Sequence, residues 1–393
     1  MASVHLERSK MKQEVVPFSI PDITQQDRRA VLEAINSRWL TGGPRVTKFE
    51  EQFASYVGVK HAVAVNSCTA ALHLTMRALD VGPDDEVIVP TLTFAATANA
   101  SLFCGAKPVF ADIDEKTFNI SPQDILRRIT PRTKAIIVVH YSGQPCDMNE
   151  IMQIAEDHGL AVIEDCAHSL GASYFNRQTG SIGTAACFSF YPTKNITTLE
   201  GGMVTSNDKD LAHRMSIMRS HAMTRGAWER SESLTWYYDV VDLGYNYRLN
   251  EVQAALGMSQ LSRVDEMNNQ RIERAHYYTQ RLKKVRGLIL PFEAENRTHV
   301  YHLYVVRVVE RKFGITRDQL FRELSEKGIG LSVHYTPLHL MIFYRKRLGT
   351  KRGDYPVAER VCDEILSLPL FAAISQNQIE YVVQEINRVA GFR

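Results

Sequence analysis

The chain has 393 residues, enough for two domains with separate hydrophobic cores. Apolar residues make up 45% and charged residues 23%, as in ordinary globular proteins, and the net charge is only +2. This balance gives no strong field for nucleic acid or an anionic membrane, so neither partner is expected. The six cysteines form no Cys-x-x-Cys pair and several lie in apolar runs. They predict reduced core residues, a cytoplasmic location and no metal site.

Residues 1–19 are expected to form a loosely held lead-in, followed by a helix at 22–38 and a turn-rich loop at 39–44. From residue 47 onward, helices alternate with short apolar strands. The expected helices cover 47–57, 69–80, 94–104, 121–129, 148–158 and 208–219. The expected strands cover 61–66, 86–89, 107–111, 134–140, 160–165, 185–190 and 202–206. Such uniformly apolar strands are typical of a sheet that helices cover on both faces.

The second half of the chain is organised differently. A long polar and aromatic stretch at 220–242 has no periodicity, which predicts a substrate-side or interface loop. A long helical region at 248–285 leads to a smaller C-terminal α+β part. Its strands are expected near 300–309 and 329–335, and its helices near 316–327, 355–366 and 376–390. We therefore expect an α/β fold with a large domain at 20–265 and a small domain at 266–393.

One lysine stands out, because Lys194 lies in a polar loop between two apolar strand-like runs, within SFYPTKNITTLEGG at 189–202. Burial at such a place would lower the pKa of the amine. A neutral amine can form an imine with an aldehyde. The alternative is a solvated surface lysine, and two further stretches favour the chemical interpretation.

The first of these stretches is a strand that ends in Asp165 and is followed by His168. The second is 66–72, where a strand end turns into a helix. Hydroxyl groups and unpaired amides at that helix N-terminus suit a phosphate dianion. Together the three stretches supply a phosphate cradle, an acid for a ring nitrogen and an amine for an aldehyde. These are the requirements of pyridoxal phosphate.

At this point the sequence resembles the DegT/DnrJ/EryC1/StrS family of sugar aminotransferases, from about residue 20 to the C-terminus. Besides the stretches above, three motifs recur in order: WLTGGP at 39–44, PTLTF at 90–94 and GYNYRLNE at 244–251. The resemblance implies the fold-type I architecture, with a seven-stranded, mostly parallel sheet in a large domain and a small C-terminal domain. It also implies pyridoxal phosphate as cofactor, with pyridoxamine phosphate as its intermediate form.

The resemblance assigns the chemistry to three residues. Lys194 would bond to the cofactor aldehyde and then act as general acid and base. Sugar dehydratases of the family carry histidine at this place, so lysine indicates transamination. Asp165 would pair with the ring nitrogen, and His168 would reach the ring face or its phenolic oxygen. A strand-end capping acid and a structural histidine are the alternatives.

The resemblance also assigns residues that hold the cofactor. Thr69, Ala70 and Ser189 would bind its phosphate, beside Cys68, where relatives usually carry glycine. A side chain at that position questions how closely the backbone approaches the phosphate. Phe94 would stack on the pyridine ring, with packing in the core as the alternative.

Two residues of the GYNYRLNE motif complete the expected site. Asn246 would cross into the neighbouring subunit's site and contact the phosphate, so the active unit would be a homodimer with shared sites. Arg248 is a candidate for the carboxylate of the amino donor. A helix-start arginine paired with Glu251 is the alternative. By the same resemblance, five further residues would line the substrate pocket: Trp39, Thr41, Gly42, His334 and Tyr335.

The expected reaction moves an amino group from L-glutamate to a nucleotide-linked keto-sugar. We favour a UDP-linked 4-keto-6-deoxyhexose in sugar or surface-polysaccharide biosynthesis. Amination at C3, or of a cyclitol ketone, is an alternative within enzymes. A non-catalytic sensor that keeps the fold is the alternative from another class. It is disfavoured because the chain contains the full set of Lys194, Asp165, Ser189 and Asn246.

Overall fold

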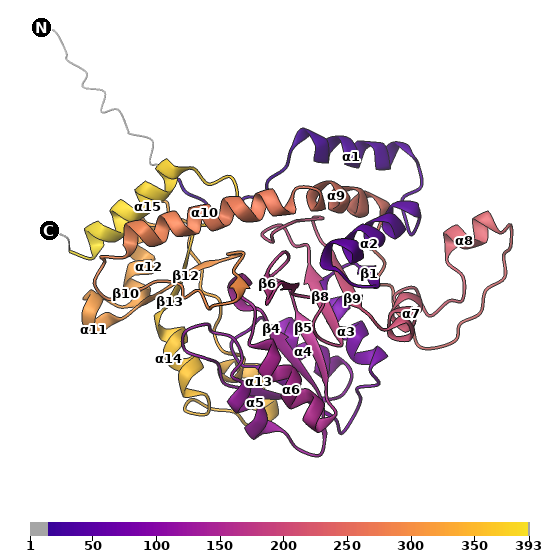
Figure 1. Ribbon diagram of the computed structural model, residues 1–393, viewed down its shortest axis with the longest axis horizontal. Helices are drawn as coiled ribbons and strands as arrows, with labels where there is room; N and C mark the ends of the chain where they lie inside the picture. Colours follow the sequence, from indigo (N-terminus) through magenta and orange to yellow (C-terminus); the bar gives the residue numbers. More distant parts are fainter. Residues whose placement is uncertain (1–14, 392–393) are drawn as a thin grey trace, which may run out of the picture.

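The computed structural model describes residues 15–391 and has a seven-stranded sheet at its centre (Figure 1). Of the expected lead-in at 1–19, residues 1–14 lie outside the described part. The strands are β1 (His61–Val65), β2 (Glu86–Pro90), β3 (Lys107–Ala111), β4 (Thr133–Val139), β5 (Ala161–Asp165), β8 (Ala185–Ser189) and β9 (Gly202–Ser206). Across the sheet the order is β1-β9-β8-β5-β4-β2-β3. Strand β9 alone runs in the direction opposite to the other six strands, so the expected mostly parallel sheet is confirmed.

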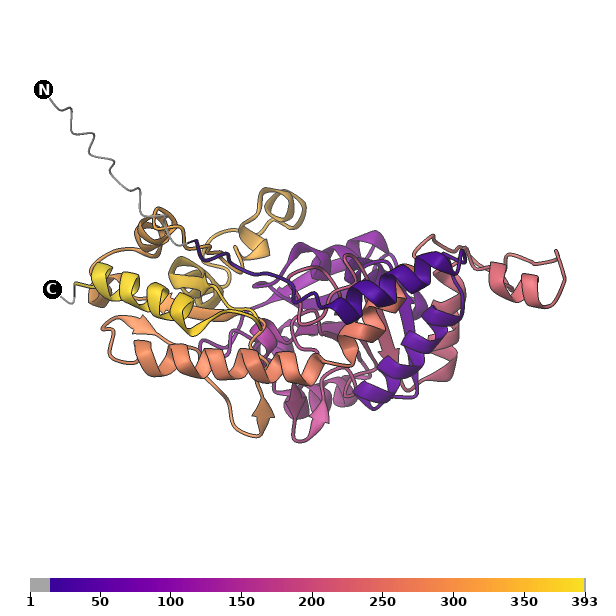
Figure 2. The same ribbon diagram turned by 90° about the horizontal axis from the view of Figure 1, so that it is seen from above.

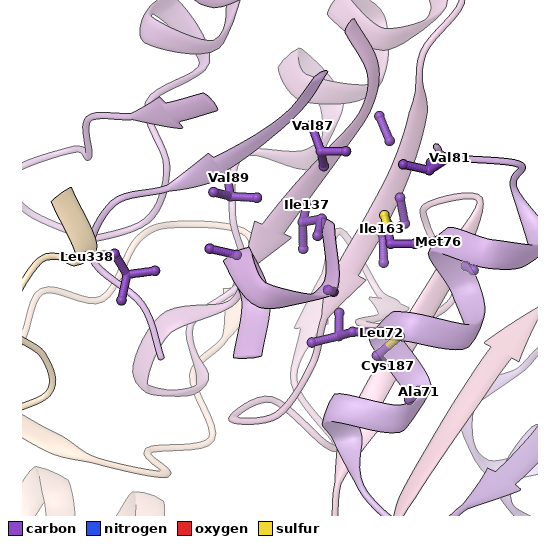
Figure 3. Close-up of a cluster of buried hydrophobic side chains, with 14 of the residues drawn as sticks. Ala71, Leu72, Met76, Val81, Val87, Val89, Ile137, Ile163, Cys187 and Leu338 are labelled. Atoms are coloured by element: carbon purple, nitrogen blue, oxygen red, sulfur yellow. The ribbon is translucent and has the colours of Figure 1, made fainter. Parts of the chain in front are cut away.

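Two hydrophobic cores explain why the strands are apolar throughout. Successive strand residues point to opposite faces, so Ile163 and Val162 belong to different cores. In the first core, Leu72 and Met76 of α3 (Cys68–Ala78) pack on the sheet, and Leu338 joins from the C-terminal part of the chain (Figure 3). On the other face, α5 (Pro122–Arg128) and α6 (Met148–His158) cover the sheet. With helices on both faces, no strand face needs polar residues.

The C-terminal part has a core of its own. Its small sheet has the order β10-β12-β13, formed by β10 (Leu288–Ile289), β12 (Tyr304–Val308) and β13 (Ile365–Leu368). It packs with α10 (Val264–Leu282), α12 (Arg317–Ser325) and α15 (Gln376–Val389). The expected single helical region at 248–285 is in fact two helices, because α9 (Glu251–Leu261) ends at a cap on Ser262 before α10 begins. Figure 1 shows α10 crossing from the large sheet to the small one.

The strand expected near 329–335 is wrong. The segment forms only isolated bridges, from Ile329 to Val16 and from Ser332 to Ser367. Its backbone packs instead against the residues that precede α1 (Gln25–Asn36), since a Cβ on Gly330 would lie 2.4 Å from the Phe18 amide. The sheet position expected for it is taken by β13, the first half of which was predicted to be the end of a helix.

The remaining elements follow the expected alternation, with several short additions. They are α2 (Pro44–Val57), α4 (Ala95–Phe103), α7 (Lys209–Met218), α8 (Ala227–Glu232), α11 (Glu310–Phe313), α13 (Ile342–Leu348), α14 (Pro356–Glu364), η1 (Tyr141–Gly143), η2 (Leu338–Leu340), β6 (Ser173–Tyr174), β7 (Arg177–Gln178) and β11 (Arg297–Thr298). Figure 2 shows α8 and its flanking segments projecting from the rest as an arm. Among residues 15–391, no helix combines the length and apolarity that a bilayer span requires.

Candidate active site

The candidate site lies where parallel strands of the large sheet end. Asp165 is the last residue of β5, and its neighbour across the sheet is Cys187 of β8. Ser189 ends β8, and the loop that follows carries Lys194, whose amide donates to Tyr191 O at 2.9 Å. Ligands on such sheets bind at the carboxyl ends of the strands.

Lys194 has an unusual amine. The residue is partly buried, and burial lowers the pKa of its amine to about 8, although the charges of Cys68 and Asp165 oppose this shift. Removal from water disfavours the ammonium form more than the nearby acids favour it. At neutral pH a useful fraction of the amine is therefore in the nucleophilic form.

Asp165 is held in one orientation by two hydrogen bonds. The Thr97 hydroxyl donates to Oδ2 at 2.8 Å, and the Ala167 amide donates to Oδ1 at 3.1 Å. Burial raises the pKa of this carboxyl, against the hydrogen bonds and the charge of Lys194. Thr97 lies in the first turn of α4, and no motif in the sequence indicates its role. A carboxylate fixed in this way is suited to face one positive group.

His168 is buried in a hydrogen-bonded chain with two further residues. Its Nδ1 accepts the Ser142 amide at 3.3 Å, and its Nε2 lies 3.1 Å from the Tyr335 hydroxyl. Because Nδ1 is an acceptor, the proton of the neutral ring resides on Nε2 and is donated to Tyr335. Burial, then the charge of Lys194, holds the pKa of His168 well below its usual range. The ring is therefore a neutral donor.

The N-terminus of α3 points into the same region. Ser67 caps the helix, and its Oγ accepts the Ala70 amide at 3.1 Å, so that predicted phosphate donor is already engaged. The amides of Cys68 and Thr69 belong to the first turn and have no partner within the helix. A Cβ on Gly202 would lie 2.6 Å from the Ser67 carbonyl carbon, so β9 approaches this helix end as closely as glycine permits.

Phe94 and His334 flank this group. Phe94 is 61% exposed, so packing in the core does not describe it, and its ring centroid lies 6.1 Å from that of Tyr335. His334 Nδ1 lies 2.8 Å from Ser367 Oγ, and burial lowers the pKa of His334 to about 4. The exposed face of Phe94 is available to a flat aromatic ring.

A second group of predicted residues lies elsewhere on the chain. Thr41, Gly42 and Arg248 line a cavity of about 460 Å³ whose lining includes none of Lys194, Asp165 and His168. Trp39 packs edge-on against Trp228 of that lining, with ring centroids 4.8 Å apart.

Near that cavity, Arg248 donates to Ser220 Oγ at 3.2 Å. Glu251, its expected alternative partner, instead accepts the Gly43, Arg45 and Val46 amides and pairs with the Arg45 side chain. Asn246 is exposed at the same end of the molecule and bridges to Ser220. The lining of this cavity thus includes Arg248 but none of the Lys194 group, while the backbone of Asn246 accepts from Asn66, just before the cap of α3.

One buried trio has the residue types of a metal site. The ligand atoms of His140, Glu164 and Cys166 lie within 4.8 Å of one another. Glu164, however, already accepts His140 Nε2 and the amides of Gly180, Ile182 and Gly183. His140 Nδ1 accepts the Cys146 amide at 3.0 Å. The histidine and the glutamate of this trio are thus already engaged in hydrogen bonds.

The groups around Lys194 fit pyridoxal phosphate. An amine with a lowered pKa, a buried carboxylate, amides at a helix N-terminus and an exposed aromatic face match the aldehyde, ring nitrogen, phosphate and ring of that cofactor. Lys194 would bond to the aldehyde and Asp165 would face the nitrogen.

Comparisons with known proteins agree with this fit. Residues 21–387 match the DegT/DnrJ/EryC1/StrS aminotransferase family. The spore coat polysaccharide biosynthesis protein SpsC of Bacillus subtilis (strain 168) is 45% identical over 376 residues, which are 95% of this chain and 97% of SpsC.

Two solved structures are similar over nearly their whole length. Spr1654 from Streptococcus pneumoniae, in its PLP form, is 30% identical with a TM-score of 0.89 and covers 96% of this chain and 99% of its own. DesI, in the presence of its TDP-sugar product, is 31% identical with a TM-score of 0.87 and covers 97% and 94%. The chain therefore belongs to the DegT/DnrJ/EryC1/StrS family and is a pyridoxal-phosphate-dependent sugar aminotransferase.

Proposed function

We propose that the enzyme moves the amino group of L-glutamate to the ketone of a nucleotide-linked keto-sugar. The first candidate is a UDP-linked 4-keto-6-deoxyhexose, aminated at C4. The observation that carries the proposal is the placement of Lys194, whose pKa is lowered, near Asp165. The two groups are close enough that the charge of each acts on the pKa of the other. Support for the substrate class comes from DesI, with its TDP-sugar product, and from SpsC, named for polysaccharide biosynthesis.

The cofactor, when bound, supplies an electron-withdrawing ring that stabilises negative charge on the reacting carbon. Lys194 would hold the cofactor through its aldehyde, and its free amine would then move a proton on Nζ between carbon atoms. Asp165, oriented by Thr97, keeps a negative charge against the ring nitrogen. His168 donates from Nε2 and so holds Tyr335 in place at the edge of the site.

The phosphate is assigned to the N-terminus of α3. Thr69 offers its amide and hydroxyl, Ser189 a hydroxyl, and the Cys68 amide lies in the same turn. Ala70 contributes to the helix end, but its own amide is used by the cap. Phe94, which is exposed, would stack on the pyridine ring.

We further propose that the active unit is a cytoplasmic homodimer with shared sites. The arm around α8 projects from the chain and carries large apolar side chains in water, with Leu234 94% and Trp236 85% exposed. Such side chains indicate an interaction surface. Asn246 is exposed near the base of the arm, where it could enter a partner's site. In a dimer, Trp39, Thr41, Gly42 and Arg248 would join His334 and Tyr335 around the substrate. Six cysteines without a disulfide suit a reducing compartment.

The first experiment is an absorbance spectrum of the holoenzyme before and after L-glutamate, with Lys194→Ala beside it. We expect a visible-region band that glutamate shifts to the near ultraviolet, and no such band in the variant. A panel of 4-keto, 3-keto and cyclitol ketones then identifies the acceptor. A wild-type protein that binds the cofactor without responding to any amino donor would refute the proposed activity and favour a non-catalytic sensor.

A further inference from the structure

A short surface helix in the C-terminal part of the chain is fixed to the fold by its inner side. In α13, the Tyr344 side chain is buried, and its hydroxyl donates to Asn99 Oδ1 of α4 at 2.7 Å. Leu348, one turn later, packs against the first hydrophobic core. These two contacts decide which face of the helix points to water. The outer face of α13 is therefore held in one orientation.

This outer face begins with two neighbouring apolar side chains that are exposed to water. Ile342 is 71% exposed and Phe343 is 55% exposed, at the first two positions of α13. The Phe343 ring packs edge-on against Tyr344, with centroids 5.2 Å apart, so the fold holds it in its exposed position. Exposed apolar residues are ordinary when they are scattered singly, whereas adjoining ones form a contact patch.

The same face continues into a dense run of cations. Arg345, Lys346 and Arg347 follow within α13, Lys351 comes shortly after its end, and all four are exposed. No side-chain ion pair or hydrogen bond joins any of these four to another residue of the described chain. Arg352, by contrast, pairs with Asp363 at 3.4 Å. Four positive groups are thus available to an anionic surface.

Acidic side chains do not offset this positive charge. The sequence has none between Glu326 and Asp354, a stretch that includes the whole of α13. Asp354 accepts the Lys351 amide at 2.8 Å, and the next acid, Glu359, is buried and bonded to His339. The net charge of only +2, from which no membrane partner was expected, therefore conceals a local concentration of positive charge.

The outer face of α13 is separate from the other surfaces that the enzyme is proposed to use. Figure 1 shows α8 at the right-hand end of the molecule, whereas α13 lies in its lower part. No residue assigned above to the cofactor or the substrate belongs to α13. Substitutions on its outer face therefore leave the proposed catalytic and dimer-forming residues in place.

We propose that the outer face of α13 docks on an anionic lipid surface. Ile342 and Phe343 would enter the headgroup region, and the four cations would meet the lipid phosphates. The combination selects this partner, because a nucleic acid matches the cations but offers Ile342 no apolar environment. Each cation near an anionic bilayer strengthens binding about fivefold, and salt screens the attraction. The enzyme would thus bind the membrane surface reversibly.

The test sediments the holoenzyme with vesicles of phosphatidylcholine alone and with vesicles that also contain phosphatidylglycerol. We expect binding to the anionic vesicles only, and weaker binding as the NaCl concentration rises. The triple variant Arg345→Gln, Lys346→Gln, Arg347→Gln should lose about 100-fold in affinity. The double variant Ile342→Ser, Phe343→Ser should lose about tenfold or more.

A matched control removes the same charge from another exposed place. Lys283, Lys284 and Arg286 follow α10 and are exposed, so their triple glutamine variant has the same net charge as the α13 variant. This control should bind anionic vesicles nearly as well as the wild type. Equal losses in both triple variants would assign the attraction to net charge and overturn the proposal.

Two further outcomes would also overturn it. The first is a wild-type holoenzyme that does not sediment with anionic vesicles at low salt. The second is binding that needs the cations but is unchanged in the Ile342→Ser, Phe343→Ser variant, which would assign the face to a soluble polyanion such as an acidic protein or a nucleic acid. Sedimentation requires no substrate, so its result is independent of the proposed transamination. An unchanged cofactor spectrum checks that each variant is folded.

Discussion

Individual side chains in this site owe their chemistry to burial more than to neighbouring charge. Lys194 illustrates this, because its pKa falls to about 8 even though Asp165 acts in the opposite direction. A lysine with an ordinary pKa would be almost wholly protonated at neutral pH. The loop between β8 and β9 therefore lowers the pKa of the Lys194 amine even when no cofactor is bound.

The lowered pKa of Lys194 predicts a pH dependence of apoprotein stability. Between pH 8 and 10.5 the unfolded chain binds the proton and the folded chain does not, so stability rises with pH in this window. Below about pH 8 both states are protonated and the effect is absent. Urea unfolding at pH 7.5 and 9.5 should show wild type gaining about 2 kcal/mol relative to Lys194→Met. A difference that is the same at both pH values would contradict the shift.

Thr97 offers a second prediction at this scale, since it acts on Asp165 and not on substrate. Asp165→Asn should reduce kcat by about 100-fold or more, because the ring nitrogen loses its negative partner. Thr97→Val should reduce kcat by about 10-fold, as expected for an orienting contact. Thr75→Val is the control, a buried helical threonine that bonds Ala71 O. Equal activities of Thr97→Val and the control would show that the orienting bond is dispensable.

At the scale of elements, the approach of β9 to the end of α3 fixes the phosphate cradle. A Cβ on Gly202 would meet backbone atoms of Ser67 and Cys68 at 2.6–2.7 Å, and backbone cannot yield as a side chain can. Gly202→Ala should therefore weaken pyridoxal phosphate binding by about tenfold or more and destabilise the fold by about 1–3 kcal/mol. Gly82→Ala, with no atom within 4 Å, is the control. Unaltered cofactor affinity, measured by fluorescence titration, would show that the contact is not required.

Glu164 joins strand β5 to the loop at 180–183. Although burial opposes it, hydrogen bonds from His140 and from loop amides hold the pKa of Glu164 below its usual range. Glu164→Gln should lower the free energy of unfolding by about 2–3 kcal/mol at pH 7, because amides lose a charged acceptor. This difference should begin to shrink below pH 4.5, where the unfolded chain takes up a proton that the folded carboxylate does not, and should be lost only as the pH falls through the lowered pKa of the folded group. A difference that does not decrease at all as the pH falls from 7 toward the acid limit of folding would contradict an ionic role.

The elements also show what sequence can predict. All seven strands of the large sheet were predicted because each is an apolar run between polar turns, and burial on both faces makes that signal strong. The segment at 329–335 misled because its residues favour strands, whereas its partners are residues 16–18 and Ser367, far away in sequence. Lys194 and Asp165 could be predicted as site residues, because each lies in a recognisable sequence motif at the end of a predicted strand. Thr97 and Ser142 could not, since only folding brings them to the site.

At the scale of the whole molecule, one chain leaves its candidate residues in two groups. Lys194, Asp165 and His168 form one, and Thr41, Gly42 and Arg248 line a cavity whose lining includes none of those three residues. The projecting arm with exposed Trp236 lies near the second group. A two-fold dimer would place the second group of one chain at the first group of the other. The domain boundary at 265, by contrast, stays a prediction, because α10 packs in the C-terminal core and also contacts the Lys194 side through Asn268.

Shared sites predict that two inactive variants restore each other. Lys194→Ala and Asn246→Ala should each be inactive or strongly impaired as homodimers. In a hybrid, one site combines Lys194 from one chain with Asn246 from the other, and that site is intact. Unfolding and refolding an equimolar mixture should give hybrids in about half of the dimers and therefore recover about a quarter of wild-type activity. If Asn246 served the site of its own chain, every site in the hybrid would carry one substitution and no activity would return. The recovered fraction thus reads out which chain supplies each residue, independently of how tightly the dimer is held.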